Sequence, residues 1–303
     1  MVVEAGAGNG RLARDVQRAQ PACARALHYV LVEPSAALRE EQRERLELEP
    51  ADEALGPFAR VAPDDPPAAV HGTGPVFVAL DELPALELRG VVLANELLDN
   101  LPFGVAERAG GGWLEIRVAH VVSGFTEVRV PAAATDARAL DAVTAGLTIV
   151  DGARLPIPRG IEAWFRACAR MLRSGTLIVL DYVDDAAGVL RRGDWLRTYR
   201  THAPGAAPLD EPGAQDITAD VVREQLLHAA RASGFAPAGD VAQADWLHDL
   251  GVDELAAAGR RTWEERAHIG DLAALAGRSR AVEAAALVDP TGLGAHRVIT
   301  FSR

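Results

Sequence analysis

Short apolar runs alternate with charged, helix-like stretches through the first third of the chain. Four of these runs are apolar almost throughout and are predicted to be strands: residues 1–4, Leu27–Val32, Val76–Ala79 and Gly90–Ala94. Helices are predicted over Arg11–Ala19, where Leu12 and Val16 share one face, and over Ala36–Leu48, which Ser35 is placed to cap. Apolar strands that alternate with helices predict an α/β fold with a mostly parallel sheet covered on both faces.

Beyond these elements the pattern changes. Apolar and polar residues alternate on either side of Ser123-Gly124, over Trp113–Val118 and Thr126–Val130, which predicts a β-hairpin insertion. An amphipathic helix is predicted over Ile161–Leu172, ended by Ser174-Gly175. The remaining predicted segments are a proline-rich loop (Pro63, Pro66, Pro67), a fifth strand over Thr176–Leu180, a loop-rich stretch over 186–216, a helix from Ala219 to Gly234 capped by Thr218, a helical stretch over 244–286 and a last strand over His296–Phe301.

Composition and charge narrow the function classes. The net charge of −12 argues against nucleic acid as the main partner, because phosphate binding needs a basic surface. All 31 basic residues are arginine, so the lysine chemistry of Schiff bases, P-loops and kinases is excluded. No apolar run approaches 18 residues and no signal peptide is recognisable, so we expect a cytoplasmic protein that has no membrane partner.

A glycine-rich turn follows the first predicted strand, with the spacing Glu4-x-Gly6-x-Gly8-x-Gly10. Glycines let a backbone approach a ligand closely, and the helix that follows offers free N–H groups. The dinucleotide fingerprint G-x-G-x-x-G would need a third glycine where Arg11 stands. The observed spacing is typical of S-adenosylmethionine-dependent methyltransferases, although a purely structural turn is the alternative.

Two acidic positions extend the predicted cofactor site. Glu33 ends the second strand, where a carboxylate accepts hydrogen bonds from both ribose hydroxyls; the alternative is a solvated glutamate before a helix. Asp81 follows the third strand and either accepts from the adenine amino group or belongs to an exposed acidic turn with Glu82. The predicted cofactor-binding residues are Glu4, Gly6, Ala7, Gly8, Gly10, Glu33, Pro34, Asp81 and Asn95.

The fourth strand ends in a polar run, Asn95-Glu96-Leu97-Leu98-Asp99. Asn95 and Glu96 are expected to face the methyl group, and Asp99 lies three residues further, so both carboxylates would share one face of a helical turn. Two carboxylates there could hold a guanidinium through paired hydrogen bonds. Asn95, Glu96 and Asp99 are therefore the predicted catalytic residues, and the alternative is that Asp99-Asn100 simply ends a helix.

Several of these stretches resemble one known family in the same order along the chain. The run Asn95-Glu96-Leu-Leu-Asp99-Asn-Leu-Pro102 is similar to the Asn-Glu-x-x-Asp-x-Leu-Pro signature of the MidA-like proteins, which include a mitochondrial arginine methyltransferase that assists complex I assembly. Three other segments also resemble the family: Glu33-Pro34-Ser35 with Leu38 and Gln42, Leu196–His202 followed by Pro212–Ala219, and Leu287–Gly294.

The resemblance implies a class I methyltransferase fold, Rossmann-like, with S-adenosyl-L-methionine as cofactor and a protein arginine as the substrate. It makes Tyr199, His202, Asp216 and Thr218 candidates for the substrate channel. No metal is implied. Members of the family carry a segment before the first strand, so we expect the start of this chain to be truncated or misassigned.

The predicted organisation is a single methyltransferase domain over 1–303. Its parts are a cofactor-binding half over 1–108, an insertion over 109–160, a helix and fifth strand over 161–185, a loop-rich and helical substrate side over 186–286 and a closing strand over 287–303. Two other functions stay open: a non-catalytic assembly factor that binds the cofactor, and a nicotinamide-dependent oxidoreductase, against which Arg11 counts.

Overall fold

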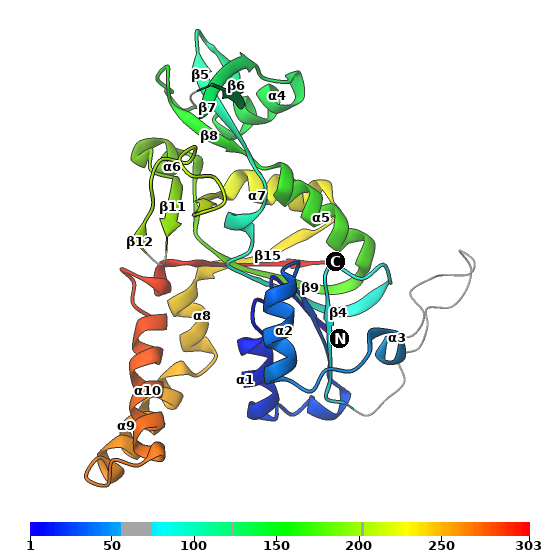
Figure 1. Cartoon of the computed structure of the whole chain (residues 1–303), viewed down its shortest axis with the longest axis vertical. Coiled ribbons are helices and arrows are strands. Elements are labelled where there is room, and N and C mark those ends of the chain that lie inside the picture. The colour runs from blue at the N-terminus through cyan, green and yellow to red at the C-terminus, as the bar shows by residue number, and fades with distance from the viewer. Residues whose placement is uncertain (56–73, 123, 201–202) are drawn as a thin grey trace.

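A computed structural model describes residues 1–55, 74–122, 124–200 and 203–303 of the chain. Its centre is a seven-stranded sheet with the strand order β3-β2-β1-β4-β9-β16-β15 (Figure 1). The strands of this sheet are β1 Val2–Ala5, β2 His28–Val32, β3 Val76–Leu80, β4 Leu88–Asn95, β9 Leu172–Asp181, β15 Ala236–Ala242 and β16 Arg297–Ser302. Strands β1 to β4 and β9 pair in parallel, whereas β16 is antiparallel to both of its neighbours.

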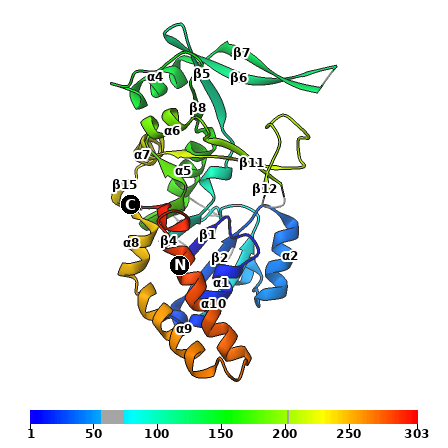
Figure 2. The ribbon, with the colours of Figure 1, turned by 90° about the vertical axis from the view of Figure 1, so that its left-hand side faces the viewer.

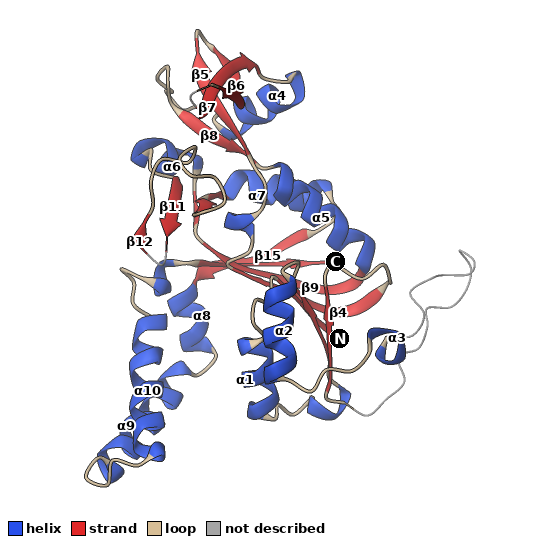
Figure 3. Cartoon of the chain, viewed as in Figure 1, coloured by secondary structure: helices blue, strands red, loops and turns tan. Residues whose placement is uncertain are grey.

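Helices cover both faces of the sheet (Figure 3). They are α1 Arg11–Ala19, α2 Ala36–Arg45, α3 Ala51–Ala54, α5 Arg159–Met171 and α7 Arg223–Ala232. Side chains of β2 alternate between the faces: Val30 and Val32 join the core with α5 and α7, while Tyr29 and Leu31 pack on the side of α1 and α2. The sheet is thus buried on both sides, as its continuously apolar strands predicted.

The local signals of the first third are confirmed. Helix α1 has the predicted bounds, and the Ser35 side chain accepts a hydrogen bond from the N–H of Leu38 at the start of α2. Helix α2 ends at Arg45, three residues before the predicted end. The predicted proline-rich loop at Pro63, Pro66 and Pro67 lies outside the described residues.

The predicted hairpin belongs to a larger insertion. Its strands β6 and β7 extend a four-stranded antiparallel sheet of order β7-β6-β5-β8, and the ribbon of β6 and β7 projects from the body (Figure 2). The elements of the insertion are β5 Gly104–Ala109, β6 Gly112–Val121, β7 Gly124–Pro131, α4 Ala134–Val143 and β8 Arg154–Ile157. They enclose a second core around Trp113, Leu140 and Leu155. Ser123, in the predicted turn, lies outside the described residues.

The stretch predicted to be loop-rich is more ordered than expected. It contains α6 Ala186–Arg192 and a small sheet of order β12-β11-β13, while β10 pairs with β14. The strands are β10 Val183–Asp184, β11 Leu196–Arg200, β12 Ala203–Pro204, β13 Asp216–Ala219 and β14 Val221–Val222. Thr218 lies inside β13, so its predicted role as a helix cap is wrong: pairing with β11 continues to Ala219, and α7 begins only at Arg223.

Two other element predictions are corrected. Ser174 and Gly175 lie within β9 and do not form a turn, because Gly175 packs directly on the backbone of Gly90 in β4. The predicted helical stretch over 244–286 is three helices, α8 Gln243–Asp249, α9 Val252–Arg266 and α10 Leu272–Leu287. Helices α9 and α10 form a hairpin that approaches closely where Gly259 meets Gly277. None of the helices described is long and apolar enough to cross a membrane.

Candidate functional site

The predicted site residues gather at one edge of the seven-stranded sheet. Parallel pairing places Ala5 of β1 beside Val32 of β2 and Ala94 of β4, so the segments that follow these three strands meet there. Strand β9 ends one step further along the same edge. Strand β16 is antiparallel, so this edge receives the residue before it, His296. The carboxyl edge of such a sheet is where α/β proteins bind their ligands.

The three glycines of the turn over residues 6–10, the glycine turn, have different surroundings. All three have positive φ, which favours glycine. A Cβ on Gly6 would lie 3.0 Å from Leu97 Cδ1, and one on Gly10 would lie 3.1 Å from Gln42 Cγ. A Cβ on Gly8 would meet nothing within 4 Å. Gly6 and Gly10 therefore allow close packing, while Gly8 leaves open space where the cofactor is predicted.

Glu33 holds the glycine turn to the end of β2. One of its carboxylate oxygens accepts from the N–H of Gly8 at 3.0 Å, and the other accepts from the N–H of Ser35 at 2.9 Å. A carboxylate has about four acceptor positions, so two remain for ribose hydroxyls. Pro34, the next predicted residue, is exposed beside it.

Helix α2 supplies two more contacts that sequence reasoning did not assign. The side-chain amide of Gln42, which is fully buried, donates to the carbonyl of Gly8 at 2.6 Å. The guanidinium of Arg45 donates to the carbonyl of Asn9 at 2.8 Å. Gln42 and Arg45 are one helical turn apart, so their spacing in the sequence could have predicted that both side chains face the glycine turn.

Two predicted acidic residues lie at opposite extremes of exposure. Glu4 is buried, and its carboxylate accepts a hydrogen bond of 2.9 Å from the hydroxyl of Tyr29. Burial raises the pKa of Glu4 to about 7, against the smaller lowering effect of that bond. Asp81 is exposed just after β3, next to Glu33, whose N–H donates to the carbonyl of Leu80. The structure thus places Asp81 at the open edge and Glu4 beneath the turn, against Tyr29.

Three carboxylates lie close together beyond β4 and β9: Glu96, Asp99 and Asp181, here called the acidic corner. Burial and then the charge of Glu96 raise the pKa of Asp99, and burial and then the charge of Asp99 raise the pKa of Asp181. Asp181 accepts from the N–H of Leu98 at 2.8 Å, and this bond fixes the turn that carries Asp99. Asp181 was not predicted, although it ends an apolar strand just as Asn95 does.

Glu96 has an unusual backbone. Its φ is +49°, a left-handed conformation that costs a non-glycine residue free energy. The predicted shared helical face with Asp99 is therefore wrong, since the 3₁₀ turn begins only at Leu98. Glu96 and the preceding Asn95 are both exposed, and the Glu96 carboxylate has no hydrogen bond or ion pair with the residues described.

Aromatic and basic groups surround the acidic corner. The rings of Tyr182 and His296 meet edge to face, with centroids 3.8 Å apart, and the guanidinium carbon of Arg197 lies 5.6 Å from the centre of the Tyr182 ring. Burial lowers the pKa of His296, and the charge of Glu96 opposes that shift. None of these three residues was predicted, because His296 precedes an antiparallel strand and Arg197 comes from a separate small sheet.

The predicted substrate residues lie on that small sheet. Tyr199 in β11 stands opposite Asp216 in β13, and Thr218 stands opposite Arg197. Residues opposite each other and two apart along a strand share one face, so these four side chains leave the same side of the sheet. His202 lies outside the described residues.

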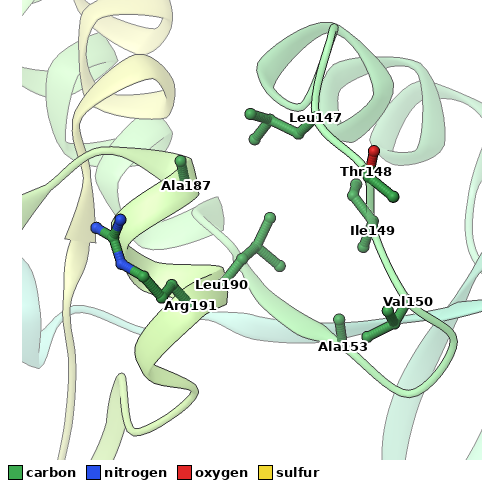
Figure 4. Close-up of a pocket in the computed structure, with 8 residues that line it drawn as sticks. All are labelled: Leu147, Thr148, Ile149, Val150, Ala153, Ala187, Leu190 and Arg191. Carbon is green, nitrogen blue, oxygen red and sulfur yellow. The ribbon is translucent and has the colours of Figure 1, made fainter.

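A separate cavity of about 210 Å³ lies between α6 and the segment 147–153 (Figure 4). Leu147, Ile149, Val150 and Leu190 supply most of its apolar lining. It contains none of the predicted site residues, so the chemistry of the chain is argued from the carboxyl edge.

Comparisons with known proteins agree with this geometry. A family model described as "Putative S-adenosyl-L-methionine-dependent methyltransferase" matches residues 1–241. The structure of a "likely methyl transferase" from Burkholderia thailandensis bound to S-adenosyl-homocysteine superposes with a TM-score of 0.76, at 27% identity, over 100% of this chain and 71% of that chain. A native structure of a protein from the same superfamily and organism gives a TM-score of 0.75, at 26% identity, over 100% of this chain and 73% of that chain. No curated protein matches the chain significantly.

Proposed function

The chain belongs to the family of S-adenosyl-L-methionine-dependent methyltransferases, and from this membership we propose that it transfers a methyl group to an arginine side chain of a protein. The fold class predicted from sequence, a class I methyltransferase fold, is confirmed by the order of the seven-stranded sheet and by the two Burkholderia thailandensis structures. The predicted cofactor, S-adenosylmethionine, is confirmed by the family and by the neighbour that binds S-adenosyl-homocysteine.

The residues at the carboxyl edge fit this cofactor. Gly8 leaves open space beside the turn, and the Glu33 carboxylate keeps acceptor positions free for ribose hydroxyls. Asp81, exposed just after β3, would accept from an adenine amino group. When bound, the cofactor supplies a methyl group on a positively charged sulfur, which leaves as a neutral thioether.

The acidic corner is the proposed acceptor site. Carboxylates recognise a guanidinium through charge-assisted hydrogen bonds, and those of Glu96 and Asp99 would draw its positive charge away from the attacking nitrogen. That nitrogen would form a bond to the methyl carbon as the carbon–sulfur bond of the cofactor breaks, and it would lose one proton. Glu96 is exposed, so its carboxylate would accept this proton and pass it to water. The chain contributes mainly by orienting the nitrogen in line with the methyl group.

One observation carries the proposal: Glu96 keeps a left-handed backbone at the end of β4, and its exposed carboxylate, which has no partner among the described residues, lies beside the buried Asp99. Strain of this kind persists where the surrounding structure imposes it, and it is concentrated at functional sites. A cation bound there would relieve the repulsion among the three carboxylates. The net charge of −12 favours a basic protein as the partner.

The test is transfer of label from methyl-labelled S-adenosylmethionine to proteins of a cell extract, followed by mass spectrometry of the labelled band. We expect the label on arginine. Glu96→Gln should lower transfer about 100-fold and leave cofactor affinity unchanged, because it removes a charge that faces the acceptor. Glu82→Gln, which alters an exposed glutamate after β3, is the matched control and should transfer normally.

The other outcomes separate the alternatives. Label on another side chain or on a small molecule would refute the arginine acceptor. Normal cofactor binding with no transfer to any component of the extract would favour the non-catalytic assembly factor. Unchanged transfer by Glu96→Gln would refute the role given to Glu96.

A further inference from the structure

Gln42 is a polar side chain buried among apolar ones on helix α2. It is fully buried, and a Cβ added at Gly10 would lie 3.1 Å from its Cγ and 3.3 Å from both Leu31 Cδ2 and Leu46 Cδ1, so leucine side chains share this space with it. Its Nε2 donates to the carbonyl of Gly8 at 2.6 Å, whereas its Oε1 has no hydrogen-bond partner among the described residues. Burying an amide with one polar atom unpaired costs free energy that an apolar side chain would avoid. The stability of the core therefore does not explain a glutamine at this position.

Side chains hold both polar backbone groups of Gly8. The N–H donates to the Glu33 carboxylate at 3.0 Å, and the same carboxylate accepts from the N–H of Ser35, just before α2. The bond from Gln42 holds the carbonyl. Glycine is conformationally permissive, and the φ of Gly8 is +53°, so these two bonds select one of the several conformations open to it. Gln42 thus acts on the same part of the turn that Glu33 contacts.

We propose that Gln42 is a positioning residue of the cofactor site, which fixes the carbonyl of Gly8 and so keeps the glycine turn and the Glu33 carboxylate in one arrangement before S-adenosylmethionine binds. A turn that is already ordered binds its ligand more tightly, because less conformational freedom is lost on binding. The inference concerns the cofactor, which follows from the family of the chain, and it does not depend on arginine as the acceptor.

The first test is Gln42→Met, which removes the donor and keeps an unbranched, flexible side chain. Affinity for S-adenosylmethionine, measured by titration calorimetry, should fall about tenfold, the effect of one lost hydrogen bond. The midpoint of urea unfolding should be unchanged or higher, because methionine buries no unpaired polar atom and Gly8 is only half-buried, so water can bond its carbonyl. A glutamine with a merely structural role predicts the opposite result, a lower unfolding midpoint with unchanged affinity.

The second test is Gln42→Glu, which keeps the shape of the side chain and makes the bond to Gly8 depend on pH. A protonated carboxyl donates to the carbonyl but a carboxylate cannot, and burial raises the pKa of such a group. The ratio of variant to wild-type affinity should therefore be close to one at pH 5 and fall about tenfold by pH 9. The charged and titratable groups of the surrounding elements are present in both proteins, so the ratio removes their contributions: Glu4 of β1, Tyr29 of β2, Glu33, Arg14 and Asp15 of α1, and Arg39, Glu41 and Arg45 of α2.

Gln225→Glu is the matched control. Gln225 is also buried, its Nε2 donates to the carbonyl of Pro156 at 2.8 Å, and its Oε1 likewise has no partner among the residues described. It lies in α7 and bonds to β8 of the insertion, away from the glycine turn. The control should make unfolding depend on pH and leave the affinity ratio within about twofold.

Normal affinity in Gln42→Met, or an affinity ratio for Gln42→Glu that does not change with pH, would overturn the proposal. An equal, pH-dependent loss of affinity in Gln225→Glu would show a general effect of buried carboxylates and would overturn it as well. If Gln42→Met does not fold, the pH dependence of Gln42→Glu decides alone. If the wild type methylates no arginine, the proposed acceptor fails, and the binding measurements still decide the role of Gln42.

Discussion

The glycine turn and the acidic corner lie on one edge of the same sheet, but they are built in opposite ways. In the glycine turn the polar groups of the backbone have partners: the N–H groups of Gly6 and Ala7 donate to the carbonyl of Val32, and Gly8 is bonded to both Glu33 and Gln42. In the acidic corner the charge of Glu96 raises the pKa of Asp99, the charge of Asp99 raises the pKa of Asp181, and the Glu96 carboxylate has no partner among the described residues.

The difference separates two ways of preparing a site. A cofactor that binds in every cycle is best received by a turn that is already in its bound shape, because no ordering cost remains. A cationic acceptor reduces the repulsion among the carboxylates of the free protein. The repulsion and the backbone strain present before binding therefore favour a cation over a neutral acceptor. Substitutions in the two regions should therefore have different signatures.

The largest effect is expected from Gly8→Arg. Its Cβ would meet nothing within 4 Å, so the fold should survive, while the long side chain fills the space left for the cofactor. Affinity for S-adenosylmethionine should fall by at least about 100-fold, measured by titration calorimetry. Gly146→Arg is the matched control, since Gly146 also has positive φ and open surroundings but lies far along the chain in the insertion. Comparable loss of affinity in both variants would show that backbone strain alone is responsible.

Next in size is Glu96→Gly, which separates function from stability in the acidic corner. Removing the carboxylate should lower transfer about 100-fold. Glycine accepts the φ of +49° without strain, so the free energy of unfolding should rise by about 1 kcal/mol. Gln20→Gly, at φ +47° at the end of α1, should give the same stabilisation with normal transfer. A destabilised Glu96→Gly would contradict the claim that strain is stored at this position.

The difference between the glycine turn and the acidic corner also explains which features could be predicted from the sequence. Strands β1 to β4, helices α1 and α2 and the cap at Ser35 follow from local patterns, because apolar runs and capping residues act within a few positions. The glycine turn and Glu33 could also be predicted locally, because each directly follows an apolar strand in the sequence. Strand β15 was missed because its sequence, with Pro237 and Gly239, has little strand propensity, and it exists by pairing with β16 at the edge.

The acidic corner needed the fold. Glu96 and Asp99 could be found by the end of their strand, but Asp181 is 82 residues further along the chain than Asp99 and meets it only because β4 and β9 are neighbours. Arg197 and His296 arrive from a separate sheet and from the start of an antiparallel strand. The prediction that Glu96 and Asp99 share a helical face was wrong because the backbone of Glu96, just after β4, is left-handed. No local sequence pattern predicts that conformation.

A moderate effect on stability is expected from Glu4→Gln, which tests the buried carboxylate beneath the glycine turn. Burial raises the pKa of Glu4 from 4.5 to about 7, so the folded chain retains a proton that the unfolded chain has lost in this window. The stabilising contribution is complete below pH 4.5 and is lost as the pH rises through 7. The glutamine cannot lose a proton and still accepts from Tyr29, so the variant should match the wild type at pH 4 and exceed it by about 3 kcal/mol at pH 8.

Urea unfolding at pH 4, 6 and 8 measures this difference. Glu47→Gln, which alters an exposed glutamate after α2, is the control and should change stability by the same small amount at every pH. A constant offset for Glu4→Gln across the range would mean that the carboxyl does not titrate with folding.

The smallest effect is expected from Asp81→Asn, which tests whether the cofactor site at the carboxyl edge of the sheet extends to the end of β3. Asp81 is exposed beside Glu33, and no described residue is bonded to it, so it is free to accept from an adenine amino group. An asparagine oxygen still accepts that bond but without the charge, so the affinity for S-adenosylmethionine should weaken only about three- to tenfold, measured by calorimetry at physiological salt. Glu82→Gln, at the neighbouring exposed position, should leave the affinity unchanged. A loss confined to Asp81→Asn would extend the cofactor side to β3, whereas equal affinities in both variants would restrict it to β1 and β2 and make Asp81 part of a solvated turn.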